Sequence, residues 1–226
     1  MTLEAALRPL VDSPARAAVL VDFDGSLSGI VDDPADAVAL PEARAALGAL
    51  TGRVGLVAVV SGRPVEILAR ALDLEGISLV GQYGLERMEG GRPITDPRVL
   101  PYLDAVAAAA DEVERGLSGL LVERKAGIAV TVHWRTAPER DAEAAAWVDE
   151  VARRHGLTVY PTRMARELRP PLPVDKGTAV GALLEPGFDA ACFAGDDRGD
   201  LPAFEALDRA VAAGRLRHAV RIGVHS

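Results

Sequence analysis

The chain has 226 residues, a length that suits one large or two small domains and allows a sizeable hydrophobic core. Hydrophobic residues make up 49% of the sequence and charged residues 26%, and no uninterrupted apolar run approaches the ~20 residues that a membrane span requires. The net charge of −8 argues against nucleic acid or an anionic membrane as the main partner.

The cysteine content and the N-terminus bear on the cellular setting. The single cysteine, Cys192, excludes an internal disulfide, and no spacing of Cys and His resembles a zinc site. The first residues, MTLEAALRPLVDSPARAAVL, lack the basic start and the pure apolar stretch of a secretory signal. We therefore expect a cytoplasmic protein, and we expect it to be a monomer.

The first part of the chain alternates short apolar runs with helical patterns. Unbroken, β-branched runs are typical of parallel strands that helices cover on both faces. These runs predict strands over Ala17–Val21, Val54–Val60 and Ile77–Val80. Apolar spacing predicts helices over Pro41–Thr51 and Val65–Leu72, with Pro64 at the first helical position of the second helix.

The middle of the chain has a different pattern. Helical spacing predicts helices over Asp96–Leu117 and Pro138–His155. Between them, the segment LLVERKAGIAVTVHWR predicts two strands that turn at residues 125–127, and further short strands are expected over Leu157–Pro161 and Arg166–Arg169. Antiparallel strands with two helices indicate a compact α+β module.

After residue 172 the parallel pattern resumes. We predict a helix over Lys176–Leu184, a strand over Ala190–Ala194, a helix over Leu201–Leu207 and two small strands near the C-terminus. The predicted fold class is therefore α/β. A doubly wound parallel-sheet core of residues 1–97 and 173–226 is interrupted by an inserted α+β cap domain of residues 98–172.

Polar clusters follow three of the apolar strands, where an open parallel sheet binds its ligands. These clusters are Asp22/Asp24, Ser61/Arg63 and Asp196/Asp197, and Lys176, one of only two lysines in the chain, precedes the third. Three or more carboxylates in one cleft repel one another unless a cation neutralises them, and an all-oxygen set without His or Cys favours Mg²⁺. A lysine and a serine beside Mg²⁺ suit a phosphate group, and an aspartate there could act as the nucleophile.

Four short motifs resemble those of a known superfamily. They are DFDGSL from Asp22, VVSGR from Val59, DKG from Asp175 and GDDRGD from Gly195. Together and in this order, they resemble the motifs of the haloacid dehalogenase (HAD) phosphatase superfamily. The long interval between the second and third motifs leaves room for a cap. This resembles the HAD-like branch with an α/β (C2-type) cap, which acts mostly on sugar phosphates.

Further segments resemble one family of that branch, the trehalose-6-phosphate phosphatases. They are LSGIVDDPADA after the first motif, GQYGLE from Gly81, VERKAGIAVTVHWR in the cap, ELRPP from Glu167, and GDDRGDLPAF. The sequence departs from the family pattern at Ser26, Tyr83, Gly199 and Leu201-Pro202, but not at the aspartates of the first motif.

This resemblance implies a Mg²⁺-dependent phosphatase that hydrolyses trehalose 6-phosphate through an aspartyl-phosphate. Asp22 would attack the phosphorus, and Asp24 would protonate the leaving sugar oxygen and then activate water. Ser61 and Lys176 would hold the phosphoryl oxygens. The predicted metal ligands are Asp22, Asp24 through its backbone carbonyl, Asp196, Asp197 and Asp200.

The same resemblance implies a second group of residues that bind the substrate. Near the phosphate these are Gly25, Gly62 and Arg63. In the cap, the residues expected to read the sugar are Glu123, Lys125, His133, Arg135 and Glu167. The expected partner is thus a small-molecule sugar phosphate.

Alternation along one cap strand agrees with a polar, sugar-binding face, because alternate residues of a strand share a face. One side holds Ile128, Val130, Val132 and Trp134, and the other holds Ala129, Thr131, His133 and Arg135. The apolar side would pack on the two cap helices and leave the polar side for sugar hydroxyls. A merely solvated sheet face is the alternative for this cap surface.

Two other functions stay open at this point. One is a phosphatase of the same branch that acts on another sugar or cyclitol phosphate, which a substrate panel would separate. The other is a non-catalytic module that binds a sugar phosphate. The intact set of Asp22, Asp24, Lys176 and Asp196 argues against the non-catalytic module.

Overall fold

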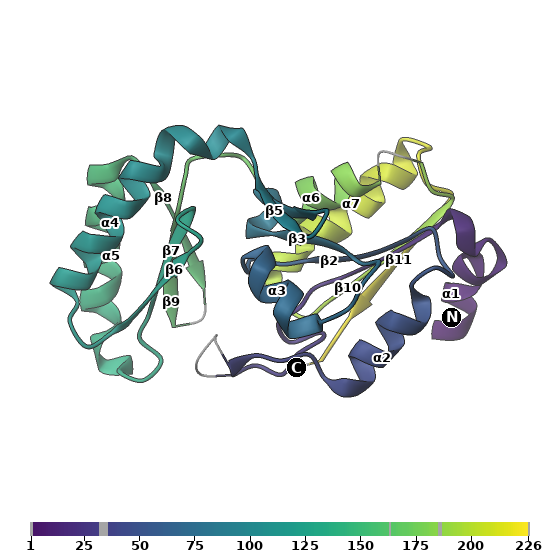
Figure 1. Cartoon of the computed structure of the whole chain (residues 1–226), viewed down its shortest axis with the longest axis horizontal. Coiled ribbons are helices and arrows are strands. Elements are labelled where there is room, and N and C mark those ends of the chain that lie inside the picture. The colour runs from purple at the N-terminus through teal and green to yellow at the C-terminus, as the bar shows by residue number, and fades with distance from the viewer. Residues whose placement is uncertain (1, 32–35, 163, 185–186, 226) are drawn as a thin grey trace. The chain divides into compact units, whose positions relative to one another are not determined.

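The computed structural model describes residues 2–31, 36–162, 164–184 and 187–225. The chain divides into two compact units (Figure 1). Met1–Ile94 together with Val174–Ser226 form the first, named here the core unit, and Thr95–Pro173 form the second, the inserted unit.

A seven-stranded sheet forms the centre of the core unit, in the order β11-β10-β1-β2-β3-β4-β5. The first five strands in this order pair in parallel, and β4 pairs antiparallel with β3. The strands are β1 (Ala17–Val21), β2 (Leu56–Val60), β3 (Ser78–Gly81), β4 (Glu86–Glu89), β5 (Arg92–Thr95), β10 (Ala190–Gly195) and β11 (His218–Gly223).

Helices cover both faces of this sheet. Leu20 of β1 packs in one cluster with residues of α6 and α7, whereas the next residue, Val21, packs with residues of α2 and α3. Since successive side chains of a strand point to opposite faces, both faces of β1 must be apolar, as its sequence AAVLV is. The helices are α1 (Leu3–Asp12), α2 (Pro41–Leu50), α3 (Val65–Leu72), α6 (Lys176–Leu183) and α7 (Leu201–Ala212). The predicted doubly wound, parallel-sheet core is therefore confirmed.

The inserted unit is a four-stranded antiparallel sheet with two helices on one face. Its strand order is β6-β7-β9-β8. On the predicted apolar side, Val130 and Val132 of β7 and Trp134 just after it pack in one core with residues of both helices. The elements are α4 (Leu103–Gly116), β6 (Leu121–Lys125), β7 (Ala129–His133), α5 (Asp141–His155), β8 (Thr158–Thr162) and β9 (Ala165–Arg169). The predicted α+β module is thus present.

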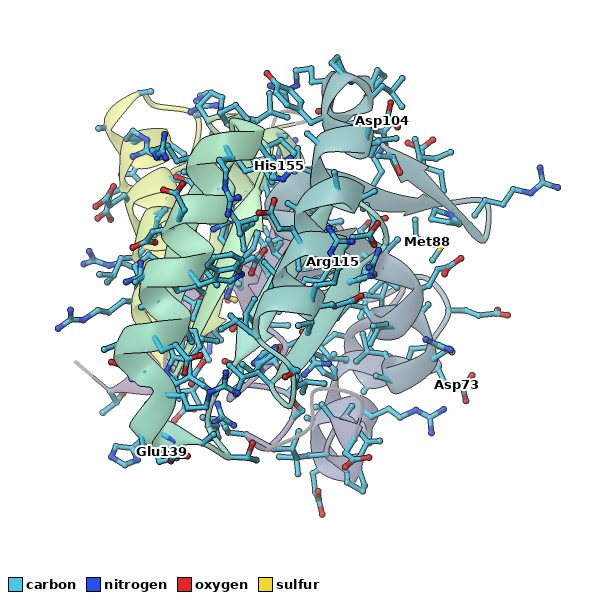
Figure 2. The ribbon with its side chains drawn as sticks, turned by 90° about the vertical axis from the view of Figure 1, so that its left-hand side faces the viewer. Asp73, Met88, Asp104, Arg115, Glu139 and His155 are labelled. Carbon is cyan, nitrogen blue, oxygen red and sulfur yellow. The ribbon has the colours of Figure 1, made fainter. Side chains whose placement is uncertain are left out.

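The outer surface of these two helices carries charged side chains (Figure 2). Arg115 lies in the last turn of α4, and His155 in the last turn of α5. Nε2 of His155 lies 2.7 Å from Oε2 of Glu112 on α4, so an ion pair or hydrogen bond links the two helices. Short 3₁₀ helices complete the fold: η1 (Pro14–Arg16), η3 (Gln82–Gly84), η4 (Pro97–Tyr102), η5 (Pro138–Arg140) and η6 (Arg198–Asp200).

Three expectations about the elements differ from the structure, and three elements were not expected. The single helix expected over Asp96–Leu117 is a 3₁₀ helix followed by α4, because Pro101 has no N–H for an α-helical hydrogen bond. Pro64 caps α3 from outside rather than occupying its first turn. Two C-terminal strands were expected, but the described residues form one, since α7 continues to Ala212 and the chain then turns at Gly214. The hairpin β4–β5 and α1 were not predicted.

None of the helices in the described part of the chain combines the length and the apolar character that crossing a bilayer requires.

Candidate active site

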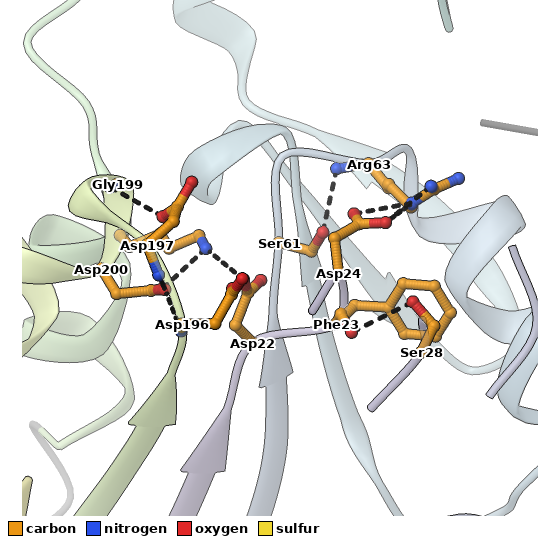
Figure 3. Close-up of polar contacts among 11 residues, drawn as sticks. Asp22, Phe23, Asp24, Ser28, Ser61, Arg63, Asp196, Asp197, Gly199 and Asp200 are labelled. Atoms are coloured by element: carbon orange, nitrogen blue, oxygen red, sulfur yellow. Dashed lines mark hydrogen bonds and ion pairs between the residues drawn. The ribbon is translucent and has the colours of Figure 1, made fainter. Parts of the chain in front are cut away.

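Three neighbouring parallel strands end in polar residues at one edge of the core sheet (Figure 3). Asp22 follows β1, Ser61 follows β2 and Asp196 follows β10. In the sheet, β1 lies between the other two, and its last residue, Val21, pairs with Ala194 of β10 and with Val59 of β2. Strand ends that are adjacent and in register bring these side chains to the same edge.

Lys176 reaches the same edge from the first turn of α6. Asp175 caps this helix and accepts a hydrogen bond from the backbone N–H of Thr178 at 2.7 Å, which starts the helix at the lysine. Nζ of Lys176 lies 2.8 Å from Oδ2 of Asp22 and 2.7 Å from Oδ1 of Asp200. The ammonium and both carboxylates are buried, so each charge depends on the others for its stabilisation.

A cluster of three carboxylates surrounds this lysine. Asp22, Asp196 and Asp200 each offer an oxygen, and these oxygens all lie within 4.8 Å of one another. The second carboxylate oxygen of Asp200 accepts hydrogen bonds from the backbone N–H groups of Asp196 and Asp197, at 3.0 and 3.2 Å. A Cβ on Gly25 would lie 2.0 Å from Oδ2 of Asp196, so the predicted site glycine makes room for this carboxylate.

The charge of the cluster fits a divalent cation. The pKa of Asp22 is raised to about 7: burial is the main cause, the charge of Asp200 adds to it, and the charge of Lys176 opposes both effects. Three carboxylates face a single ammonium, which leaves negative charge in excess. A cation beside these oxygens would stabilise their ionised forms, and oxygen donors without His or Cys are those that Mg²⁺ prefers. The residues present therefore suit Mg²⁺.

Two predicted metal ligands use their carboxylates elsewhere. Asp197 is exposed, and its Oδ1 accepts a hydrogen bond from the backbone N–H of Gly199 at 2.8 Å, which caps η6. The carboxylate of Asp24 pairs with Arg63, whose Nε donates to Oδ2 at 2.8 Å and whose Nη2 donates to Oδ1 at 2.7 Å. The prediction for Asp24 concerns its backbone carbonyl, which this ion pair does not occupy.

The loop that follows β2 holds Ser61, Gly62 and Arg63. Ser61 is buried, and its Oγ accepts a hydrogen bond from the backbone N–H of Arg63 at 3.2 Å. Arg63 is a predicted substrate-binding residue; its guanidinium pairs with Asp24, and 9% of the Arg63 side chain is exposed. The Asp24 side chain is 45% exposed and remains accessible from solvent.

The polar face of the inserted sheet carries the predicted sugar-binding residues. Nζ of Lys125 lies 3.0 Å from Oε2 of Glu167, and Nε2 of His133 lies 3.1 Å from Oε2 of Glu123. The strand register sets Glu123 beside Thr131 and Thr131 beside Glu167, across three adjacent strands. The face therefore presents charged groups that are already paired with one another.

Three further polar residues share this face and were not predicted as site residues: Thr131, Tyr160 and Arg169. The Thr131 hydroxyl is buried and has no hydrogen-bond partner among the described residues. The guanidinium carbon of Arg169 lies 3.4 Å from the ring centroid of Tyr160. Alternate residues of a strand share a face, so Arg169 lies on the same face as Glu167 and could have been predicted from the sequence as a residue of this face. Arg135 lies beyond the end of β7 and is half-buried.

Comparison with known proteins decides the family. A family model described as trehalose-phosphatase matches residues 20–225. This chain belongs to the trehalose-phosphatase family. A curated relative, a trehalose-phosphate phosphatase of Mycobacterium marinum (strain ATCC BAA-535 / M), is 34% identical over 227 residues. That match covers 96% of this chain, and the chain spans 58% of the length of the relative.

Solved structures agree with this family and with its fold. The crystal structure of a trehalose-6-phosphate phosphatase related protein matches with a TM-score of 0.75 and 26% identity, over 92% of this chain and 87% of that one. A haloacid dehalogenase-like hydrolase from Bacteroides thetaiotaomicron shares the fold with a TM-score of 0.58 at 16% identity, over 93% of this chain and 89% of that one. The predicted HAD-like α/β fold class is confirmed.

The departures from the trehalose-phosphatase pattern have defined places in the structure. Tyr83 lies with its ring against Gly62. Gly199 donates its backbone N–H to Asp197 in the cap of η6. Leu201, at the start of α7, is 52% exposed, and the carbonyl of Pro202 lies against Gly177. Residues 32–35 of the segment LSGIVDDPADA lie outside the described part of the chain.

Proposed function

We propose that this member of the trehalose-phosphatase family hydrolyses trehalose 6-phosphate to trehalose and inorganic phosphate with the help of Mg²⁺. The observation that carries the proposal is the buried Asp22 carboxylate, which lies 2.8 Å from Nζ of Lys176 within a three-carboxylate cluster. Asp24, the partner that the chemistry needs for proton transfer, follows two residues later at the same sheet edge. The substrate is inferred from the Mycobacterium marinum relative, a trehalose-phosphate phosphatase.

Asp22 is the nucleophile in this proposal. A carboxylate oxygen of Asp22 forms a bond to phosphorus while the bond between phosphorus and the sugar oxygen breaks, which gives an aspartyl-phosphate and trehalose. Lys176 holds a phosphoryl oxygen and orients Asp22, and the Ser61 hydroxyl donates a hydrogen bond to a second phosphoryl oxygen. Because Lys176 is buried beside Asp22, its charge acts there in a medium that screens it weakly.

Asp24 moves the protons. In its protonated form it donates a proton to the sugar oxygen that leaves phosphorus, and the resulting carboxylate then accepts a proton from the water that attacks the aspartyl-phosphate. The second step releases inorganic phosphate and restores the carboxylate of Asp22. The Asp24 side chain is 45% exposed, which gives both the substrate oxygen and water a path to it.

Asp22, Asp196 and Asp200 would hold Mg²⁺, with the Asp24 backbone carbonyl as a further oxygen ligand and Asp197 in support. When bound, the ion supplies positive charge that offsets the negative charge of the phosphoryl group and of the carboxylates. Lys176 already pairs with two of these carboxylates, so the chain itself keeps the cluster assembled.

The inserted unit selects the substrate in this proposal. We expected the cap over residues 98–172, and the polar face of its sheet offers paired acids and bases that suit neutral sugar hydroxyls. Glu123, Lys125, His133, Arg135 and Glu167 are the residues that we propose to contact the sugar.

Release of inorganic phosphate from a substrate panel tests the proposal. The panel contains trehalose 6-phosphate, sucrose phosphate, glucose 6-phosphate, a cyclitol phosphate and 4-nitrophenyl phosphate, each with Mg²⁺. We expect the highest kcat/KM on trehalose 6-phosphate. A higher kcat/KM on another sugar phosphate would support the phosphatase activity but would show that trehalose 6-phosphate is not the preferred substrate. If no compound released phosphate, the proposed activity would be wrong, and a non-catalytic module that binds a sugar phosphate would be the remaining interpretation.

A further inference from the structure

Two loops at the carboxyl ends of β2 and β3 hold each other through backbone hydrogen bonds. The first is residues 61–63, named here the serine loop, and the second is the turn of residues 81–84. Gln82 donates its backbone N–H to the carbonyl of Arg63 at 3.0 Å, and Tyr83 donates to the carbonyl of Ser61 at 3.1 Å. Both ends of the serine loop are thus tied to the turn, on either side of Gly62.

Close packing adds to these hydrogen bonds. A Cβ on Gly62 would lie 2.5 Å from both Cζ and Oη of Tyr83, so the phenol ring lies directly against the backbone of Gly62. In the other direction, a Cβ on Gly81 would lie 2.4 Å from the carbonyl oxygen of Arg63. Each loop has a glycine where the other approaches, and neither could carry a side chain there without displacement.

The turn adopts a conformation that its residues disfavour. Gln82 and Tyr83 have φ angles of +50° and +59°, in the left-handed region that side chains rarely occupy. Such a conformation persists only where the surrounding structure determines it, and it is concentrated at functional sites. Gln82 is 1% exposed, so the turn is embedded in the core unit rather than formed freely at its surface.

A third contact holds the chain just after the serine loop. The carboxylate of Glu86, which is 4% exposed, accepts a hydrogen bond from the backbone N–H of Val65 at 3.1 Å. Val65 is the first residue of α3. The segment GQYGLE therefore contacts the backbone from Ser61 to Val65 at its start, middle and end.

The serine loop also holds the Asp24 side chain in place through Arg63. The guanidinium of Arg63 binds both oxygens of the Asp24 carboxylate, at 2.8 and 2.7 Å, and the Arg63 side chain is only 9% exposed. A bidentate pair fixes the plane of a carboxylate as well as its position. Any shift of the backbone at Arg63 therefore changes where the Asp24 carboxylate lies.

We propose that Tyr83 is a positioning residue: it fixes the serine loop and, through Arg63, sets the orientation of the Asp24 carboxylate. This inference rests on the proposed function, in which Asp24 protonates the leaving oxygen. Tyr83 has no chemical step of its own. Its ring and its backbone N–H act on Gly62 and Ser61, and Arg63 transmits their position to Asp24.

The dependence of rate on the leaving group tests this inference. A nitrophenolate leaves without a proton, whereas a phenolate gains more from protonation by Asp24. Tyr83→Ala should therefore lower kcat/KM on phenyl phosphate by about tenfold more than on 4-nitrophenyl phosphate, a part of the roughly 10²–10⁴-fold that general acid catalysis supplies. Arg63→Lys, which removes the bidentate contact, should shift the ratio in the same direction.

Controls separate positioning from folding. Tyr83→Phe keeps the ring against Gly62 and should keep the wild-type ratio, and Tyr102→Ala, a tyrosine outside the site, should keep it too. If Tyr83→Ala does not fold, Tyr83→Leu removes the ring and keeps apolar bulk, and it should show the same change. Equal losses on both aryl phosphates, or no loss, would overturn the inference. A wild-type protein without activity on either compound would overturn the proposed function itself.

Discussion

Each of the two units buries one of the chain's two lysines against carboxylates, but the charge around the two lysines differs. Lys176 of the core unit lies between Asp22 and Asp200, with the carboxylate of Asp196 close by. Lys125 of the inserted unit lies 3.0 Å from Glu167, and the Arg169 guanidinium lies 3.5 Å from the other oxygen of that glutamate. Negative charge exceeds positive around Lys176, whereas two cations share one carboxylate around Lys125.

This difference matches two kinds of ligand. A cluster with excess negative charge attracts a metal cation, and the cation allows a phosphate to enter among carboxylates. On the polar face of the inserted sheet as a whole, the acids Glu123 and Glu167 offset the bases Lys125 and Arg169. This face therefore needs no charged ligand, yet its groups still donate and accept hydrogen bonds. By its charge, the core unit is thus suited to a phosphate group, and the inserted unit to neutral hydroxyl groups, as the proposed function requires.

The largest effect is expected when the proposed nucleophile of the core unit is removed. Asp22→Asn should lower kcat by about 10⁴-fold or more, because a carboxamide keeps the volume but cannot form the aspartyl-phosphate. Phosphate release from 4-nitrophenyl phosphate measures the loss, and circular dichroism should show an unchanged fold. Asp12→Asn, at an exposed position, is the matched control. Activity within about tenfold of the wild type would contradict the assignment of Asp22.

Metal removal tests whether the carboxylates around Lys176 bind a cation that the activity requires. EDTA should lower activity by about 10³-fold or more, since the charge of a bound metal supplies several kcal/mol to such reactions. Mg²⁺ should restore the activity, whereas Zn²⁺, which prefers nitrogen and sulfur ligands, should restore little. Full activity in chelator after exhaustive dialysis would show that the acidic cluster works without a cation.

A pair of lysine variants compares the two units directly. Lys176→Met leaves two buried carboxylates without their cation, and breaking a buried ion pair in this way costs about 3–5 kcal/mol of unfolding free energy. Lys125→Met should cost less, because Arg169 remains beside Glu167. Urea unfolding of both variants in EDTA measures the difference. A larger loss for Lys125→Met would reverse the comparison between the two sites.

Much of the fold was predictable where local rules and packing agree. Ala17–Val21 was predicted with the bounds that the structure has, and the helix Val65–Leu72 differs only in that Pro64 lies just outside it. An unbroken apolar strand and a proline-preceded amphipathic helix suit their buried places. The hairpin of β4 and β5 was not predicted. Its residues ERME and RPIT are mostly exposed, so no hydrophobic pattern marks them as strands.

The candidate site was predictable as a set of residues but not as a set of contacts. Strand ends, glycines and the rare lysine identify Asp22, Lys176 and Asp196 from the sequence. The ion pair of Arg63 with Asp24 could not be predicted in this way, because it joins side chains 39 positions apart in the sequence, and their directions depend on tertiary packing. The left-handed backbone at Tyr83 could not be predicted from the sequence either, because a tyrosine disfavours this conformation. Only the contacts with the neighbouring serine loop account for it.

The smallest expected effect lies in the inserted unit and separates sugar recognition from chemistry. Glu167→Ala should lower kcat/KM on trehalose 6-phosphate by roughly tenfold to 150-fold, because losing a buried charged hydrogen bond costs about 1.5–3 kcal/mol. Hydrolysis of 4-nitrophenyl phosphate should change little, since this substrate has no sugar hydroxyls for Glu167 to contact. Glu167→Gln, which keeps an acceptor oxygen at the same place, should recover part of the activity on the sugar phosphate. Equal losses on both substrates would mean that Glu167 supports the fold or the chemistry, and no loss on either would mean that the polar face of the inserted sheet is only a solvated surface.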